Sequence, residues 1–516
     1  MQKTGVLIIG AGPTGLMMAC QLAMQKIPFI IVEKDPASTT ESRAIGIQAR
    51  SLEIFEQMGI ADKFVKEGQP AQDIDFVVNG KIVEDIPLSG MGEGLTKFPY
   101  LLILEQFKTE KNLLDFLESK KVKVHYDTTV MSFIQDNDKT TAVIQTKNRK
   151  KETIEADWIV GADGAHSIVR HTLGIELAGK TYKQSLFVLD CHISSPTISP
   201  THLSVALSST AFAAIFPMPN HHYRIVGEVP PRLYGKDTIT FEDIQSDFAE
   251  RMQMDIKLSK PYWVSLYHAH HRCVATFKKG RCFLVGDAAH IHSPVGAQGM
   301  NTGLQDAYNL AWKLAFVYKK LAKDEILETF NEDRLPTAKK LVETTDRAFN
   351  LIINPSKIGL FFRTRIAPKV IKFVLSHNGF KQFIFRTVSQ IGISYHSGSL
   401  SKNASFGKFS KDAPKPGDRL PYIADLQEKI TPTHFHLFIF TKNENMEEIE
   451  KMAEQYKNIM LVSKITFNET TKKIYDAFGI TDSSYYLVRP DMYIAFRSNG
   501  KNEKEFEEYL SRFFIS

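Results

Sequence analysis

Short apolar runs alternate with amphipathic stretches at the start of the chain. Residues 6–10 and 29–33 are rich in Val and Ile, and residues 14–25 between them carry apolar side chains at helical spacing. This pattern predicts a strand–helix–strand unit, whose crossover is right-handed in a parallel sheet. Further helices are expected at 50–58 and 113–119, and further strands at 121–125, 131–146 and 153–160.

The pattern changes between residues 174 and 272. Apolar and polar positions alternate there, with Pro, Asn and Ser between the runs, which is typical of an antiparallel sheet. The chain then returns to a buried strand at 282–286, and helical patterns follow at 299–321 and 324–353. We therefore expect an α/β fold in which an antiparallel sheet is inserted into a Rossmann-like domain.

Two further regions complete the chain. A helical, apolar and basic stretch predicts a linker packed between domains, although a segment lying on a membrane surface would have the same composition. Strands and helices alternate again from residue 397 and predict a small separate α/β domain. The expected boundaries are 1–175 and 273–350 for the Rossmann-like domain, 176–272 for the inserted sheet, 351–396 for the linker and 397–516 for the last domain.

Composition narrows the classes of protein. The chain has 516 residues, 43% hydrophobic and 24% charged, with a net charge of +6, which suits two or three globular domains. The dispersed basic charge argues against nucleic-acid binding and suits an anionic ligand. The four cysteines form no CxxC pair, and no apolar run reaches the roughly 18 residues of a spanning helix. The first predicted strand begins almost at residue 1, so we expect no signal peptide. We expect a cytoplasmic protein without a bound metal.

The first apolar run ends in Gly10-Ala11-Gly12-Pro13-Thr14-Gly15. Gly10 permits a tight turn, Gly12 lets the backbone approach a pyrophosphate, and Gly15 lets the helix pack closely on the strand. Pro13 and Thr14 begin the helix, whose positive end faces the phosphates. Glu33, followed by Lys34, ends the second strand, where a carboxylate can accept hydrogen bonds from ribose hydroxyls. These residues predict a dinucleotide cofactor site.

Two more turns with a glycine and an acid follow apolar strands. Asp163 lies in Gly-Ala-Asp-Gly at 161–164, and Gly286-Asp287 precedes a second glycine-rich stretch at 295–301. An Asp at the end of a strand can bind the polyol of a flavin. The backbone N–H groups of a helix that begins near Gly299, Met300 and Asn301 can stabilise negative charge on reduced flavin. The three turns together favour FAD over NAD as the resident cofactor.

These segments resemble the group A FAD-dependent aromatic hydroxylases, the para-hydroxybenzoate hydroxylase type. The resemblance is carried by GAGPTG, ESRAIGIQARSLEIF, VGADGAHSIVR and FLVGDAAHIHSPVGAQGMNTGLQDAYNLAWKLA. The later segments YHSGSL, PGDRLP and YLVRPDMYIAFRS resemble the phenol hydroxylase and pentachlorophenol hydroxylase branch. The resemblance implies that the inserted sheet binds substrate and that the last domain is thioredoxin-like.

The resemblance also assigns roles to single residues. It implies that Arg43 and Gln106 contact the pyrophosphate or ribityl region, and that Asp163 serves both FAD and NAD(P)H. It places Pro294 beside the flavin, and Met300 and Asn301 against the edge of the ring system. Phe216 and Met218 would form the floor of the substrate cavity together with Pro294, although ordinary core packing explains Phe216 and Met218 equally well. Ala297 departs from the family, which often has Gly at this position.

The activity implied by the resemblance is monooxygenation of an aromatic or polyketide-like small molecule. NADPH or NADH reduces FAD, O2 reacts with the reduced flavin, and a C4a-hydroperoxyflavin transfers one oxygen. The alternatives are a flavin-dependent oxidase or reductase, or a halogenase, on the same scaffold, and a non-catalytic FAD-binding protein; the WxWxIP segment of halogenases is absent. The sequence identifies no catalytic base, since each histidine at 221–222 and 268–271 is better explained as a surface or core residue.

The last domain contains no cysteine, so it cannot carry out thiol–disulfide exchange. We expect it to be structural, or to contact a second subunit in a homodimer.

Overall fold

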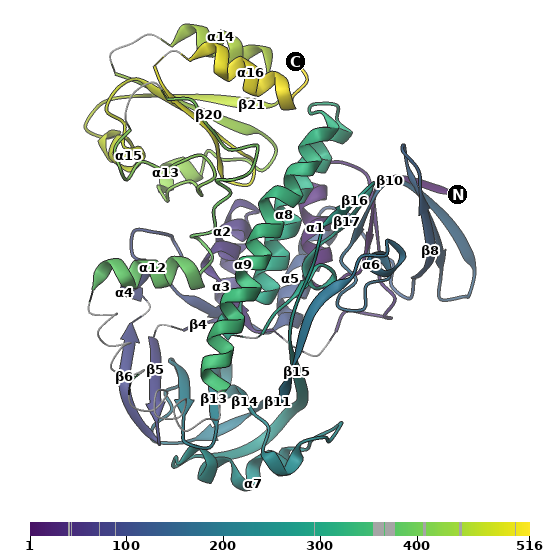
Figure 1. The fold of residues 1–516 in the computed structure, drawn as a ribbon, viewed down its shortest axis with the longest axis vertical. Helices are drawn as coiled ribbons and strands as arrows, with labels where there is room; N and C mark the ends of the chain where they lie inside the picture. The colour runs from purple at the N-terminus through teal and green to yellow at the C-terminus, as the bar shows by residue number, and fades with distance from the viewer. Residues whose placement is uncertain are drawn as a thin grey trace.

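The fold was analysed in a computed structural model of the full chain. It describes residues 1–39, 42, 44–71, 73–87, 89–293, 295–353, 366, 377–405, 409–442, 446–500 and 502–516. Figure 1 shows a Rossmann-like domain beside a large curved sheet, with the carboxyl-terminal domain at the opposite end of the molecule from that sheet. The long helix α8 (Gly299–Tyr318) extends from the central domain toward the carboxyl-terminal domain.

The Rossmann-like domain is built on a seven-stranded sheet with the order β16-β17-β10-β1-β2, to which β9 and β8 add an antiparallel hairpin. Its strands are β1 (Gln2–Ile9), β2 (Phe29–Val32), β8 (Thr129–Gln135), β9 (Thr140–Gln145), β10 (Lys151–Gly161), β16 (Lys278–Lys279) and β17 (Cys282–Leu284). Strand β1 lies between β10 and β2 and is parallel to both. Helix α1 (Pro13–Gln25) packs against α5 (Gln106–Ser119) and α8. Strand β10 is parallel to both β1 and β17, so the carboxyl ends of these three strands meet at one edge of the sheet.

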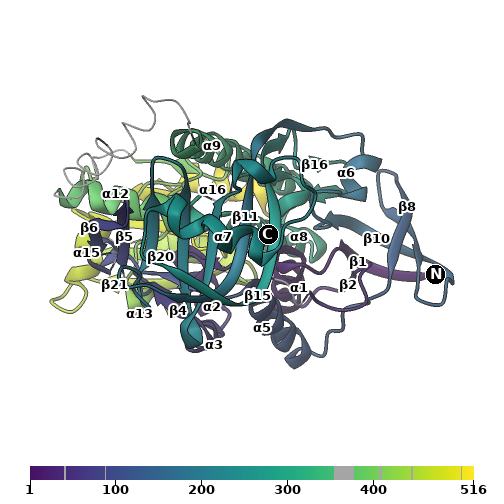
Figure 2. The same ribbon diagram turned by 90° about the horizontal axis from the view of Figure 1, so that it is seen from below.

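The inserted region forms an eight-stranded sheet with the order β18-β15-β11-β14-β13-β12-β5-β6. Its strands are β5 (Asp73–Val78), β6 (Lys81–Pro87), β11 (Leu177–Ser194), β12 (Leu203–Leu207), β13 (Phe212–Met218), β14 (His222–Glu228), β15 (Lys257–Val274) and β18 (His290–Ile291). Helix α7 (Phe241–Met252) covers its outer face, as Figure 2 shows from below. The hairpin β5–β6 comes from within residues 1–175, so the sheet draws on more of the chain than the predicted insertion.

The remaining elements join these layers. A small three-stranded sheet has the order β3-β7-β4, with β3 (Gly46–Ile47), β4 (Gln69–Ala71) and β7 (Leu101–Ile103). The other helices are α2 (Ala49–Gln57), α3 (Ala61–Glu67), α4 (Ser89–Gly92), α6 (Ile168–Thr172), α9 (Glu328–Ile353) and α12 (Asn378–Val388), and the short 3-10 turns include η3 (Gly286–Ala288) and η4 (Val295–Ala297). Of the predicted linker at 351–396, residues 354–365 and 367–376 lie outside the described residues. No helix within the described residues has the length and apolarity to cross a membrane.

The carboxyl-terminal domain has the thioredoxin-like arrangement. Its core alternates as β20 (Phe435–Thr441), α14 (Glu447–Gln455), β21 (Met460–Thr466), α15 (Lys472–Phe478), β22 (Ser484–Val488), β23 (Ile494–Asn499) and α16 (Glu503–Phe513), with the short elements β19 (Lys402–Asn403) and α13 (Ala424–Gln427) before it. Strand β20 is parallel to β21 and antiparallel to β22, which pairs with β23. The predicted fold class is thereby confirmed.

Candidate active site at the strand ends

The first glycine turn leaves open space at one position. Gly10 has a φ of +102°, and a Cβ on it would lie 2.4 Å from the carbonyl oxygen of Ala162. A Cβ on Gly15 would lie 1.9 Å from the carbonyl oxygen of Gly10, so neither glycine tolerates a side chain. A Cβ on Gly12, by contrast, would meet nothing within 4 Å. Gly12 precedes Pro13 at the start of α1, whose first N–H groups are free to bind an anion. A diphosphate fits this space.

The acid at the end of β2 is held beside this turn. The Glu33 carboxylate accepts hydrogen bonds from the backbone N–H of Ala11 at 2.6 Å and of Asp35 at 3.1 Å. Glu33 remains half-buried, and the neighbouring Lys34 side chain is exposed. The predicted ribose-binding carboxylate is therefore fixed within reach of the open space at Gly12.

Gln106 begins α5 on the other side of this region. Its side chain accepts a hydrogen bond from Ala44 N at 3.2 Å and donates one to Glu110 at 2.9 Å. Burial, reinforced by the charge of Glu33, raises the pKa of Glu110 to about 7. Gln106 thus links the segment that precedes β3 to a buried carboxyl group. Arg43, predicted to contact the same cofactor region, lies outside the described residues.

Asp163 follows β10 and has one unsatisfied oxygen. Its Oδ2 accepts a hydrogen bond from Val169 N at 3.2 Å, whereas the buried Oδ1 has no partner in the protein. Burial raises the pKa of Asp163, and the Ser167 hydroxyl and nearby N–H groups oppose this rise. Ser167 also caps α6 through Arg170 N. A buried carboxylate oxygen without a partner fits a ligand with hydroxyl or amide donors.

The third turn brings Gly286 and Asp287 to the start of α1. Gly286 has a φ of +59°, and a Cβ on it would lie 2.7 Å from Oγ1 of Thr14. A Cβ on Gly303 of α8 would lie 2.2 Å from the same oxygen, so the turn, α1 and α8 are in close contact. Asp287 has an exposed side chain at the beginning of η3. The three predicted acids, Glu33, Asp163 and Asp287, therefore follow neighbouring strands of one sheet edge.

The glycine-rich segment after β18 leads into α8. Gly299, Met300 and Asn301 form its first turn, and Gln298 before them provides no side-chain cap, so these N–H groups have no partner within the helix. The Asn301 side chain is fully used by the protein: it accepts from Gln48 N and the Ser51 hydroxyl and donates to the carbonyl groups of Gly46 and Ala297. Asn301 can therefore contact a ligand only through its backbone. Pro294 lies outside the described residues.

The inner face of the eight-stranded sheet, defined here as the face opposite α7, carries two apolar clusters. One contains Phe212, Leu186, Val226, Tyr267 and Phe349 of α9, and the other contains Phe216, Met218, Leu203 and residues of the small sheet. Val205 contacts both clusters. The predicted pair Phe216 and Met218 thus lies where β13 contacts β4 and β7 of the small sheet. The third strand of that sheet, β3, contains Gly46, whose carbonyl oxygen accepts the hydrogen bond from Asn301.

A buried ion pair on this inner face was not expected from the sequence. Arg224 donates from Nε and NH2 to Asp190, at 2.6 Å each, and from NH1 to the carbonyl oxygen of Ser42. Its guanidinium group also lies over the Trp263 ring. Arg224 therefore joins the large sheet to the segment that contains Arg43. The partners are distant in sequence, so no local motif indicates them.

A cavity of about 390 Å³ opens beside the Asp163 turn and is rich in cationic side chains. Its lining comprises Ala165, His166, Arg170, His171, Ile175, Glu176, Leu177, His270, Arg272 and Ile291. The Nε atoms of Arg170 and Arg272 have no hydrogen-bond partner in the protein. Burial lowers the pKa of His270, and Arg272 lowers it further. This cavity has the charge and donors that an anionic ligand requires.

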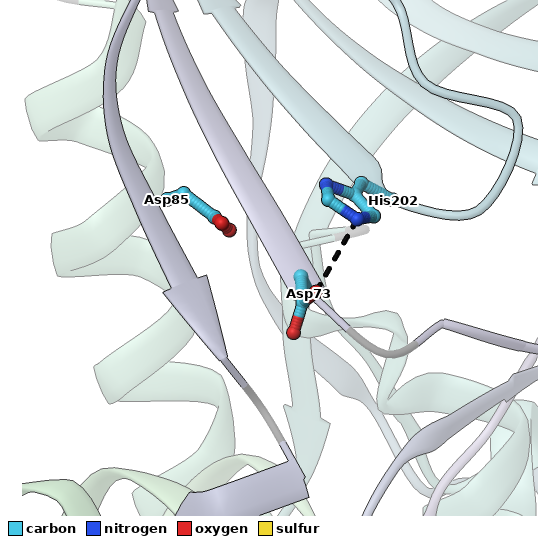
Figure 3. A group of neighbouring side chains, drawn as sticks. All are labelled: Asp73, Asp85 and His202. Atoms are coloured by element: carbon cyan, nitrogen blue, oxygen red, sulfur yellow. Dashed lines mark ion pairs between the residues drawn. The ribbon is translucent and has the colours of Figure 1, made fainter.

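One group in the described part of the chain has side chains close enough together to hold a metal ion: Asp73, Asp85 and His202, shown in Figure 3. His202 lies 3.2 Å from Asp73 through Nε2 and 3.0 Å from Asp75 through Nδ1. Burial lowers the pKa of His202, but the surrounding carboxylates outweigh burial and raise it. A carboxylate on each ring nitrogen favours imidazolium, so we interpret the group as an ion-pair cluster.

Comparison with known proteins identifies the family. Residues 3–345, about two thirds of the chain, match the family described as "FAD binding domain". The chain belongs to this family. The open space at Gly12, the unsatisfied oxygen of Asp163 and the uncapped start of α8 all fit FAD. The cofactor inferred from the three glycine turns is thereby confirmed.

Relatives within the FAD-binding family are monooxygenases. The chain is 28% identical to 6-methylpretetramide 4-monooxygenase of Streptomyces rimosus over 95% of this chain and 90% of the relative. It is 29% identical to pentachlorophenol 4-monooxygenase of Sphingobium chlorophenolicum over 81% of this chain and 75% of the relative. The flavin-dependent monooxygenase PieE, solved with FAD and substrate, has the same fold, with a TM-score of 0.81 and 21% identity over 99% of this chain and 98% of that chain.

This member of the FAD-binding family is therefore a FAD-dependent monooxygenase of the aromatic hydroxylase type that uses NAD(P)H and O2. The predicted family and enzyme class are confirmed, and the relatives support monooxygenation over the oxidase, reductase and halogenase alternatives. The individual contacts predicted for FAD and substrate remain predictions.

Proposed function

We propose that the enzyme hydroxylates a fused-ring aromatic compound bound between the inner face of the eight-stranded sheet and the flavin loops. The observation that carries this proposal is the pair of apolar clusters on the inner face, from Phe349 to Met218, which share Val205 and reach the small sheet. In that sheet, Gly46 of β3 accepts a hydrogen bond from Asn301. The names of two relatives from Streptomyces rimosus support the same class: 6-methylpretetramide 4-monooxygenase, 28% identical, and 12-dehydrotetracycline 5-monooxygenase/anhydrotetracycline 6-monooxygenase, 30% identical.

When bound, FAD supplies the redox chemistry that activates O2 for oxygen transfer. The residues of the chain bind and orient it. Glu33 would hold the adenosine ribose, the N–H groups after Gly12 the diphosphate, and Asp287 the ribityl hydroxyls. The positive end of α8 would stabilise negative charge on the reduced ring system. The apolar inner face would exclude water from the reacting atoms.

The cationic cavity is our proposed docking site for the phosphates of the nicotinamide cosubstrate. Arg170 and Arg272 offer unsatisfied guanidinium donors there, and the Asp163 turn joins the cavity to the FAD site. Two guanidinium groups favour NADPH, which carries one more phosphate than NADH. We expect Arg272→Gln to raise the KM for NADPH about tenfold, the loss of one charge-assisted contact. The KM for NADH should rise less, because NADH lacks the additional phosphate.

The matched control for this variant is Arg281→Gln, because Arg281 lies outside the cavity and donates to the carbonyl oxygens of Asn137 and Asp157. Steady-state kinetics with both nucleotides would distinguish the variants. An unchanged KM for NADPH in Arg272→Gln would refute the docking site without affecting the substrate assignment.

The substrate proposal is tested by a compound panel that contains matched single-ring phenols and tetracyclic phenols. We expect fused-ring compounds to stimulate NADPH oxidation and to yield a product heavier by one oxygen atom in mass spectrometry. Hydrogen peroxide release without any oxygenated product across the panel would contradict monooxygenation of this class. Stimulation by single-ring phenols alone would leave monooxygenation intact and refute the fused-ring preference.

A cytoplasmic location and a homodimer are part of the same proposal. All four cysteines are free thiols, and burial raises the pKa of each, which suits a reducing compartment. Light scattering of the purified protein would test the homodimer.

A further inference from the structure

The turn that carries Asp287 is held by one buried carboxylate. Asp306, on α8, accepts hydrogen bonds through Oδ2 from Gly286 N at 3.0 Å and from His290 Nε2 at 2.7 Å. Asp306 is fully buried. Burial alone would raise its pKa, but Arg334 and His290 lower it below the usual range, so the group is a carboxylate. Both ends of the segment 286–290 are thereby fixed to one side chain.

The second oxygen of Asp306 binds Arg334 of α9. Arg334 donates from Nε to Asp306 Oδ1 at 2.7 Å and from NH2 to the carbonyl oxygen of Thr302 at 3.1 Å. Its remaining nitrogen, NH1, donates to the Tyr395 hydroxyl at 3.0 Å. Thr302 lies in the first turn of α8, so Arg334 holds both the start of this helix and the carboxylate that fixes the Gly286 turn.

Tyr395 belongs to the segment that leads into the carboxyl-terminal domain and packs on that domain. Its ring lies 4.2 Å from the Tyr493 ring, and the Arg489 guanidinium lies over it at 5.3 Å. Arg489 forms ion pairs with Asp333 of α9 at 2.8 Å and with Asp491 at 2.6 Å, and all three side chains are buried. An unbroken chain of contacts thus runs from the carboxyl-terminal domain through Arg334 to the flavin turn.

A contribution to the stability of the fold does not by itself explain why so many charged side chains are buried here. Replacing buried ion pairs with packed apolar side chains is often neutral or stabilising, so such pairs are better explained where they fix one arrangement. Here the buried ion pairs fix the turn that contains Gly286. Gly286 has a left-handed backbone and no side chain that could hold it in place, so the turn depends on contacts from neighbouring residues.

We propose that Asp306 is a positioning residue of the FAD site and that the carboxyl-terminal domain, through Tyr395 and Arg334, keeps it in place. This inference depends on the assignment of Gly286 and Asp287 to FAD, which Asp287→Ala tests separately. The carboxyl-terminal domain lacks cysteine. It would thus contribute to FAD binding by holding α8 and α9, which in turn hold the flavin turn.

The test uses full-length protein from which FAD has been removed, titrated with FAD and followed by flavin fluorescence. Tyr395→Phe removes only the hydroxyl that accepts the hydrogen bond from Arg334. This variant should bind FAD about tenfold more weakly, the loss expected for a hydrogen bond to a charged group. Tyr486→Phe is the matched control: its hydroxyl is equally buried and donates to Phe478 O within the same domain, outside the chain of contacts. It should change FAD affinity by less than about twofold, the usual effect at a remote site.

A double-mutant cycle with Asp306→Asn separates positioning from stability. Asp306→Asn should weaken FAD binding strongly, and Tyr395→Phe should then have little further effect, because both act through Arg334. Arg334→Lys replaces Asp306→Asn in the cycle if the latter does not fold. Equal weakening by Tyr395→Phe and Tyr486→Phe, unchanged affinity in Tyr395→Phe, or additive effects in the cycle would each overturn the proposal.

Discussion

Two glycines of the first turn give opposite predictions for the same substitution. In Gly12→Ala the new methyl group meets no atom of the protein within 4 Å, and the φ of −71° is ordinary for alanine. The protein without FAD should therefore keep its stability or gain up to about 0.5 kcal/mol, because alanine restricts the unfolded chain. The methyl group would occupy the space that the diphosphate needs, so we expect FAD affinity to fall about 100-fold, roughly 2.7 kcal/mol.

In Gly10→Ala the methyl group would lie 2.4 Å from the carbonyl oxygen of Ala162, in a residue with a φ of +102°. This variant should lose about 2 kcal/mol or more of stability even without FAD, since strain and a clash with backbone combine. Thermal unfolding of the FAD-free variants and FAD titration would measure both effects. Full FAD affinity in Gly12→Ala, or equal destabilisation of the two FAD-free variants, would refute the assignment of the open space to the diphosphate.

Three other predictions concern the same site. Asp287→Ala and Glu33→Arg should each weaken FAD retention sharply, and purified variants as yellow as the wild type would contradict the assignment. Ala297 has a φ of +52°, so Ala297→Gly should raise stability by about 0.5–1 kcal/mol, measured as the unfolding temperature. The pKa of Glu110 is raised to about 7 from 4.5, so the folded state binds more protons and should lose stability as pH rises from about 4.5 to 7, by about 3 kcal/mol in total. Glu110→Gln should remove this slope in denaturant titrations at several pH values, and an unchanged slope would show that Glu110 is not its source.

The sequence predicts the parts of the site that depend on local backbone geometry. The turn at Gly10–Gly15 and the acid at Glu33 could be placed because a strand, a tight turn and a helix follow one another within a few residues. The strand alternation at 186–229 likewise indicated the antiparallel sheet. The resemblance places Asn301 against the flavin edge, and this contact stays a prediction. Because the Asn301 side chain binds the backbone of Gly46 and Ala297, the contact is expected through its backbone N–H group.

The sequence alone could not predict which distant segments pair with each other. The hairpin β5–β6 has the alternation of any exposed hairpin, and only its parallel pairing with β12 places it in the large sheet. Arg224 and Asp190 are separated by 34 residues and become partners because β14 lies beside β11. Charged residues of this kind look like surface residues in a sequence, since burial is decided by which elements pack together.

The carboxyl-terminal domain illustrates why a fold does not determine a role. A thioredoxin-like sheet suggests redox chemistry, yet residues 397–516 contain no cysteine to perform it. The turn 489–493 between β22 and β23 instead places Arg489 and Asp491 against α8 and α9, where Trp312 donates to Asp491 at 3.1 Å. Charges at this depth are costly unless every partner is in place, so we expect the domain to dock in one position. A domain that docks in only one position can fix the helices that carry the flavin turn, which a flexibly attached redox module could not do.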